Sequence, residues 1–139
     1  MDLPPPEKPD VVLRVPADSA YVSVLRTMTA GLAARLDFTV DDIEDLRIAV
    51  GEACALVLPE AEAGGDLEAE FRLQRSALTV SVSVPTVGSR APDENSFAWQ
   101  VLTTLATSAH ARAGDERCEV TFVTESSVPP DEGRLGVLG

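Results

Sequence analysis

The sequence is poor in aromatic, thiol and imidazole side chains. Aromatic residues make up 4% of the 139 residues, and there are two cysteines and one histidine. Leucine, valine and alanine must therefore fill most of the core. Cys54, Cys118 and His110 match no zinc-binding spacing, and no Cys-x-x-Cys pair occurs. We expect no metal site, and two buried thiols in a reducing compartment.

Long apolar runs are also missing. No stretch approaches the ~20 apolar residues that a membrane-spanning helix needs. The segment from Met1 to Pro9 lacks the apolar centre of a signal peptide. By elimination, we expect a cytoplasmic location.

Positive charge is scarce. Eleven lysines and arginines stand against 23 acidic residues, which gives a formal net charge of −12. Phosphate backbones would repel such a chain, so direct binding to nucleic acid is not expected. The acidity fits either a basic protein partner or plain solubility, because net charge alone does not separate the two.

Prolines and glycines gather at the two ends of the chain. Residues 1–9 contain Pro4, Pro5, Pro6 and Pro9, and the last residues are again rich in proline and glycine. This pattern predicts a disordered arm over 1–9, one domain over 10–126 and a flexible tail over 127–139. With 45% hydrophobic residues, the middle part can bury one core.

Three helices are indicated between these ends. Residues 19–36 carry apolar side chains at intervals of three and four, and a second helix follows with Thr39 or Asp41 as its N-cap. Ser96 caps a third helix, with Phe97, Val101, Leu105 and Ala109 along one side. This helix places His110 at its end, where a cap or dipole role fits better than catalysis. We expect its Trp99 to face the core.

The remaining segments alternate with a period of two and predict strands. Residues 67–73 and 78–84 form an antiparallel hairpin, and residues 11–15 and 117–124 supply a first and a last strand. The order is strand, helix, helix, strand, strand, helix, strand. Helices that cover one face of such a sheet give a two-layer α/β sandwich, with three helices on a mixed, mostly antiparallel sheet.

The second helix carries a family resemblance. It reads DIEDLRIAVGEAC from Asp42 to Cys54. This run is similar to the N-box helix of the GHKL ATPase superfamily, and it most resembles the RsbW-type anti-sigma factors, which are serine-protein kinases. Residues 96–106 look like the third helix of actinobacterial members. The resemblance covers roughly residues 10–125 and implies the GHKL, or Bergerat, α/β sandwich.

The resemblance also shows where the ATP-binding motifs depart from the family pattern. In RsbW-type kinases a glutamate orients the attacking group, and an asparagine four residues later helps to hold Mg²⁺. Glu52 matches the glutamate, but Leu56 stands at the asparagine position and offers no oxygen to a hard cation. Glu52 is therefore interpreted as a degenerate N-box residue, exposed or capping rather than catalytic.

Two further nucleotide motifs are absent. The family's Asp-x-Gly-x-Gly turn is replaced by residues 85–89, which contain no aspartate and one glycine. The glycine-rich approach to the third helix is replaced by residues 93–99, where Asp93 and Glu94 would repel a triphosphate. The loop over 85–95 is also short for an ATP lid. We expect neither ATP nor Mg²⁺ as a cofactor.

The partner-binding surface is a separate matter. In the family, the first helix carries an arginine that contacts both the sigma factor and its antagonist, and this arginine corresponds to Arg26. A guanidinium binds a carboxylate through two parallel hydrogen bonds, which suits an interface anchor. The resemblance thus implies an anti-sigma factor of the stress-response type. It would bind an alternative sigma factor and be released by an anti-anti-sigma STAS-domain protein.

Other functions remain open at this stage. The chain would be an active kinase of its antagonist if it bound Mg-ATP after all. It would be a pseudo-ATPase scaffold if no sigma factor bound, or a small-molecule sensor if Leu56 and Val87 lined a vacated, apolar pocket. A homodimer through the sheet or first helix would suit so small a chain. No Gly-x-Ser-x-Gly elbow occurs, so a hydrolase is not expected.

Overall fold

Five strands form one sheet in the computed structural model, which describes residues 8–88 and 90–128. Their order across the sheet is β1-β2-β3-β5-β4, and every pairing is antiparallel. The strands are β1 (Val11–Pro16), β2 (Asp66–Gln74), β3 (Ala77–Pro85), β4 (Ser108–Gly114) and β5 (Arg117–Glu125). The sheet, predicted to be mixed and mostly antiparallel, is thus antiparallel throughout the described residues.

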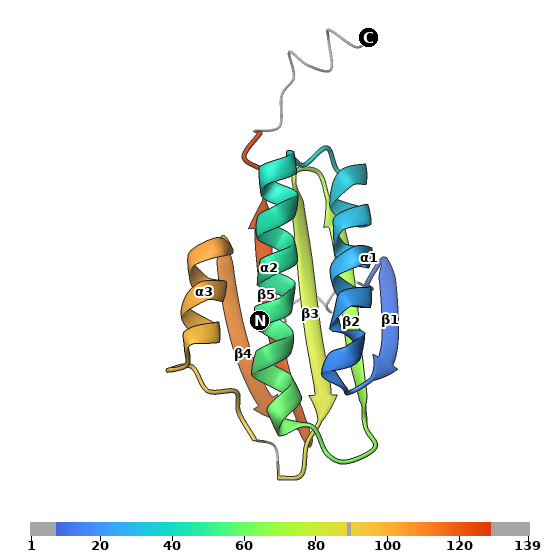
Figure 1. The fold of residues 1–139 in the computed structure, drawn as a ribbon, viewed down its shortest axis with the longest axis vertical. Coiled ribbons are helices and arrows are strands. Elements are labelled where there is room, and N and C mark those ends of the chain that lie inside the picture. Colours follow the sequence, from blue (N-terminus) through green and yellow to red (C-terminus); the bar gives the residue numbers. More distant parts are fainter. Residues whose placement is uncertain (1–7, 89, 129–139) are drawn as a thin grey trace, which may run out of the picture.

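Three α-helices lie side by side across one face of this sheet (Figure 1). They are α1 (Val22–Arg35), α2 (Val40–Val57) and α3 (Phe97–Leu105), and the short 3-10 turns η1 (Ser19–Tyr21) and η2 (Leu58–Glu60) precede α1 and follow α2. The central helix α2 packs against both other helices and against β3 and β5. The predicted two-layer α/β sandwich is confirmed.

A capping box begins α2. The Thr39 side chain accepts a hydrogen bond from the backbone N–H of Asp42 at 3.1 Å, and the Asp42 carboxylate accepts one from the Thr39 N–H at 3.3 Å. Of the two predicted caps, Thr39 is therefore the correct one. Asp41 and Asp42 place negative charge in the first turn, where the helix dipole favours it.

The core lies between α2 and the inward-facing residues of the central strands. Along β2 and β5 every second side chain is buried, as the alternating sequence predicted. In the central strand β3 the apolar residues are buried against the helices, and Ser81 and Ser83 on the other face are buried as well. Cys54 of α2 and Cys118 of β5 are both buried and unpaired, as expected. The opposite face of the sheet is polar, with Arg14 hydrogen-bonded to Glu68 at 2.7 Å.

The third helix is shorter than predicted, and the strand after it was missed. The helix ends at Leu105, and residues 108–114 form the edge strand β4 along β5. The prediction that His110 lies at a helix end is therefore wrong, because His110 is an exposed strand residue opposite Thr121. The alanine-rich sequence suits a helix. Here the unpaired edge of β5 supplies ladder hydrogen bonds, and alternate residues Ala109 and Ala111 pack against the core.

The inward side of α3 also differs from the predicted stripe. Leu102 is fully buried, whereas Phe97 is 75% exposed. Trp99 is partly buried and packs against the core, as expected. The first turn of α3 therefore leaves a large aromatic side chain exposed on the surface.

The described ends of the chain are attached to the sandwich. The Asp10 backbone N–H donates to the Phe71 carbonyl at 2.8 Å, and Ser127 donates to the Asp42 carboxylate through its N–H at 3.0 Å and its hydroxyl at 2.9 Å. Most of the predicted arm (1–9) and tail (127–139) lies outside the described residues. Across 8–88 and 90–128, no helix combines the length and apolarity needed to cross a bilayer.

Loss of the capping box should destabilise the protein measurably. We expect Thr39→Ala to lower the free energy of unfolding by about 1 kcal/mol, because one N-terminal N–H of α2 loses its acceptor. Thr39→Ser keeps the hydroxyl and should retain most of the stability. Urea unfolding of the three proteins checks this, and equal losses for both variants would contradict the capping role.

The Asp42 carboxylate should make stability depend on pH. Burial raises its pKa, but the hydrogen bonds it accepts from Ser127 and Thr39 outweigh this, and the net pKa is lowered from 3.8. The ionised carboxylate therefore stabilises the fold above the unfolded pKa, and this contribution is lost as pH falls below about 4. We expect the Tm difference between wild type and Asp42→Asn to shrink over that range. A difference independent of pH would contradict this account.

Candidate functional site

A seam between α1 and α2 holds the predicted partner-binding residue, Arg26. Arg26 is half-buried, and its guanidinium lies against the backbone of Gly51 on α2. A Cβ atom at Gly51 would stand 2.5 Å from Nη2, 3.0 Å from Nε and 3.1 Å from Cζ of Arg26. The guanidinium thus occupies the space that any larger residue at position 51 would need.

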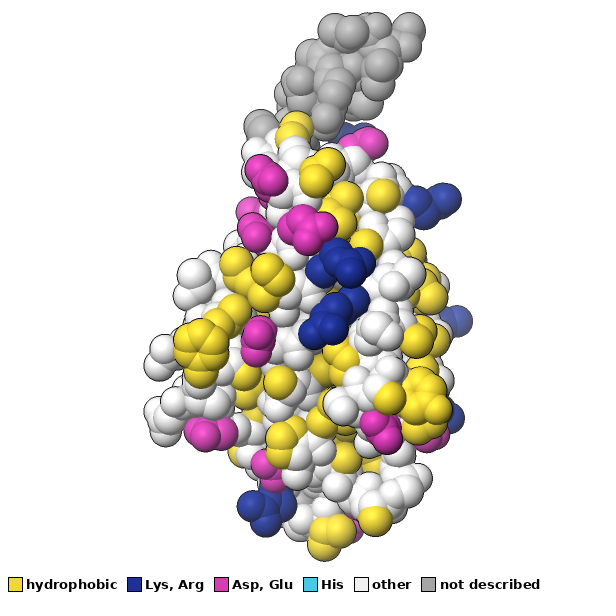
Figure 2. Space-filling view, in the orientation of Figure 1, with side chains coloured by type: hydrophobic (Ala, Val, Ile, Leu, Met, Phe, Trp, Pro, Cys, Tyr) yellow, Lys and Arg dark blue, Asp and Glu magenta, His cyan; other side chains and the backbone are white. Residues whose placement is uncertain are grey.

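A second arginine shares this seam. Arg47 lies one helical turn before Gly51 on the same side of α2, and it is also half-buried. Figure 2 shows two basic side chains side by side over the boundary between α1 and α2. We call Arg26, Arg47 and Gly51 the arginine seam. Within the described residues neither arginine forms an ion pair; the ion pairs there involve Arg14, Arg72, Arg90 and Arg112.

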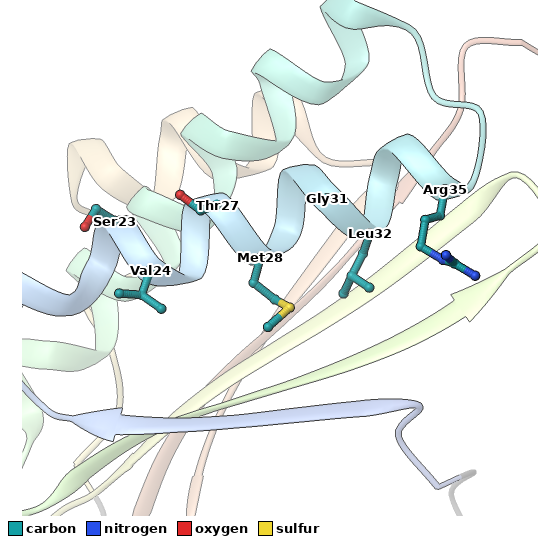
Figure 3. Close-up of a pocket in the computed structure, with 7 residues that line it drawn as sticks. All are labelled: Ser23, Val24, Thr27, Met28, Gly31, Leu32 and Arg35. Atoms are coloured by element: carbon teal, nitrogen blue, oxygen red, sulfur yellow. The ribbon is translucent and has the colours of Figure 1, made fainter.

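One exposed apolar side chain lies next to the arginine seam on α2. Ile48 directly follows Arg47 and is 46% exposed. A separate groove of about 650 Å³ lies on the outer side of α1, and Val24, which is 43% exposed, lines it. Figure 3 shows Val24, Met28 and Leu32 pointing from α1 into it, toward the β1 edge of the sheet. Cations bordered by exposed apolar side chains are typical of protein-binding surfaces.

The predicted N-box positions, Glu52 and Leu56, lie on the other side of α2. Glu52 follows Gly51 directly, so its side chain leaves the helix about 100° further round, away from the arginine seam. It is half-buried and forms no ion pair in the described part of the chain. Leu56, one turn later, is 4% exposed and belongs to the hydrophobic core. The structure therefore separates Arg26 from the position where the family's nucleotide chemistry would take place.

The described residues between β3 and α3, 86–88 and 90–96, form hydrogen bonds with each other and with η2. Arg90 donates to Glu60 of η2 at 2.8 Å, and its backbone N–H donates to the Thr86 hydroxyl at 3.3 Å. At the far end of the loop, Ser96 caps α3 by accepting from the Trp99 N–H at 3.2 Å. Arg90 thus connects this segment to η2, directly after α2.

The hollow beside the described part of this loop has charged side chains in its lining. This hollow of about 420 Å³ is lined by Pro59, Glu60, Ala61, Glu62, Val87 and Arg90. Val87 contributes to it as predicted, but Leu56 does not, because its side chain is in the core. Two glutamates make the hollow a poor fit for a triphosphate. In the described residues no group of His, Cys, Asp or Glu gathers as a metal site would.

Both thiols are held in the protonated form. Burial raises the pKa of Cys54 to about 12, partly opposed by the positive charge of Arg26. Burial and the negative charge of Glu60 raise the pKa of Cys118 to about 11. Neither thiol has the low pKa that a nucleophile or a redox sensor needs.

Comparison with known proteins gives relatives of one kind. No family model matches the sequence. The chain is 40% identical over 74 residues to "Serine-protein kinase RsbW" of Halalkalibacterium halodurans, a match that covers 52% of this chain and 46% of that protein. It is 36% identical over 75 residues to the protein of the same name in Bacillus thuringiensis, covering 52% of this chain and 47% of the relative. The chain thus spans about half the length of these curated relatives.

A solved structure shares the fold. It contains the RsbU and RsbW domains of Rv1364c from Mycobacterium tuberculosis, with a TM-score of 0.62 and 16% identity, covering 87% of this chain and 34% of that one. At this identity the likeness shows the architecture alone. Together, the relatives and this structure confirm the predicted resemblance to RsbW-type proteins and the GHKL-like fold. The roles of Arg26 and Glu52 stay predictions. The sequence analysis did not identify Gly51. Its only signal in the sequence is its position inside a predicted helix, where glycine is unfavourable.

The thiols should be unreactive in the folded protein. We expect neither Cys54 nor Cys118 to react with a disulfide reagent such as DTNB at pH 8, because both are buried and protonated there. Both should react at once in guanidinium chloride. Fast labelling of one thiol without denaturant would show that its part of the core opens readily.

Proposed function

We propose that this relative of the RsbW-type proteins is an anti-sigma factor that works by binding alone. It sequesters an alternative sigma factor through the helical layer and keeps it from core RNA polymerase. An anti-anti-sigma protein with a STAS domain releases the sigma factor by competing for an overlapping surface. No phosphate transfer is part of this cycle.

The arginine seam is the observation that carries the binding role. Arg26 and Arg47 are half-buried, and no carboxylate of the described residues neutralises them. In a chain with a net charge of −12, ample acidic residues were available to pair with them. Partly desolvated arginines without an internal partner favour an external one, because their forked donors fit a carboxylate.

The residues at the positions of the family's ATP-binding motifs support a function without a kinase step. A buried leucine stands where the Mg²⁺-binding asparagine would be, and it cannot coordinate a cation. The approach to α3 has Asp93 and Glu94 in place of glycines. In the family, backbone N–H groups at the start of this helix would bind the phosphates of ATP. Here the two carboxylates next to them would repel those phosphates.

The alternative function is an active serine kinase that phosphorylates its antagonist. It is favoured by the relatives, whose names describe serine-protein kinases, and by the retained Glu52. This alternative requires Mg-ATP. Isothermal titration showing micromolar Mg-ATP binding, lost in Glu52→Ala, would establish it in place of the binding-only function.

Substitutions of Arg26 and Glu52 should affect sigma-factor binding differently. We expect Arg26→Ala to weaken binding of the sigma factor about thirtyfold, the loss typical of an interface anchor. Glu52→Ala should leave this affinity unchanged, because its side chain points away from the arginine seam. The measurement is isothermal titration with each purified alternative sigma factor of the source organism, supported by inhibition of transcription in vitro.

Three results would count against the proposal. If none of the sigma factors binds the wild-type protein, the anti-sigma function is wrong. If Arg26→Ala binds as tightly as wild type, the seam is not the interface. If Glu52→Ala loses binding to the same degree as Arg26→Ala, partner binding depends on the nucleotide side of α2.

A further inference from the structure

Gly51 gives the Arg26 guanidinium its position. This glycine lies in the interior of α2, where glycine is less favourable than alanine by roughly 0.5–1 kcal/mol. Its backbone is ordinary helix, so the missing side chain, not an unusual φ angle, explains what the residue allows. What occupies the free space is the Arg26 guanidinium, with Nη2 only 2.5 Å from where a Cβ would be. The guanidinium therefore lies against α2 at Gly51, one helical turn along the helix from Arg47.

We infer that Arg26 and Arg47 form one composite site for a single carboxylate of the sigma factor, and that Gly51 positions Arg26 for it. The inference rests on the proposed function and deepens it. It adds Arg47 as a second binding residue and Gly51 as a positioning residue.

The donors present in the seam fit a carboxylate. Mid-helix backbone N–H groups are used within the helix, so the seam offers only the side-chain donors of the two guanidinium groups. A phosphate site would normally add free backbone N–H groups from a helix start or a loop. One forked side chain from each of two neighbouring helices lies at the α1–α2 boundary, and together they can match the two oxygens of one carboxylate.

The surroundings define the kind of segment that binds. Ile48 directly follows Arg47 on α2 and exposes apolar surface next to it. The complementary segment carries an aspartate or glutamate with an apolar residue beside it, as on one face of an amphipathic helix. The overall charge of the chain would repel an acidic segment at a distance, so recognition depends on this local reversal of charge.

A substitution at Gly51 tests the positioning role without removing any charge. Gly51→Ala pushes the guanidinium out of the seam, while the protein should fold at least as stably, because alanine favours a helix. Gly31→Ala on α1 is the matched control, because a Cβ there meets nothing within 4 Å. We expect Gly51→Ala to weaken sigma-factor binding about tenfold, with Gly31→Ala unchanged and neither Tm lowered.

A double-mutant cycle tests whether the two arginines share one carboxylate. Arg26→Ala and Arg47→Ala should each weaken binding, and the double variant should lose less than the product of the two single losses. Arg75→Ala removes an exposed arginine in the β2–β3 turn and serves as the control for net charge. Multiplicative losses, or an effect of Arg75→Ala equal to that of Arg47→Ala, would overturn the shared site.

A partner-free measurement separates this inference from the proposed function. In NMR spectra of the free protein, sodium acetate should shift the Nε–H signals of Arg26 and Arg47 together, while sodium chloride at the same ionic strength should not. In Gly51→Ala the joint shift should be lost. If a sigma factor binds but Arg47→Ala and Gly51→Ala behave as wild type, the composite site is wrong and the anti-sigma function stands. If no sigma factor binds while acetate shifts both signals, the carboxylate site stands and its assignment to a sigma factor falls.

Discussion

The packing of α2 across the middle of the sheet is the contact on which the rest of the structure depends. α2 touches both other helices and the central strands β3 and β5. Its inward side is made of fully buried residues, including Leu46, Val50 and Val57, which meet the apolar side of the sheet. One helix therefore sets the position of the arginine seam on its α1 side and of Glu52 on its α3 side. The two surfaces are neighbours in sequence and separate in space.

Most of the fold could be predicted because the strands of the central sheet alternate cleanly and the start of α2 carries a strong cap. The error lies in residues 106–114, which are rich in alanine and contain no β-branched residue after Thr107. Their local preference is helical. Their strand conformation comes from pairing with β5, and the sequence of this segment alone does not reveal that pairing. Because β4 was missed, His110 was assigned to the end of a helix that stops five residues earlier.

The candidate site could be predicted only in part. Arg26 was reached through a family resemblance, and nothing in the local sequence distinguishes it from any other helix arginine. The contact between Arg26 and Gly51 depends on how α1 and α2 pack, which no spacing within one helix reports. The mid-helix glycine was nonetheless a visible signal, since a residue that weakens a helix usually serves packing or function there. To predict the contact at Gly51, one would also need to know which helix packs beside it and which side chain of that helix fills the space.

Because the two sides of α2 are separate, a substitution on one side can leave the other side unchanged. Leu56 belongs to the core, whereas the Arg26 guanidinium lies against Gly51, which is more than a turn earlier on the helix. If the proposed roles hold, partner binding and nucleotide binding would rest on different sets of side chains. A change at position 56 could then alter the second and leave the first in place, provided the core continues to hold α2 against the sheet.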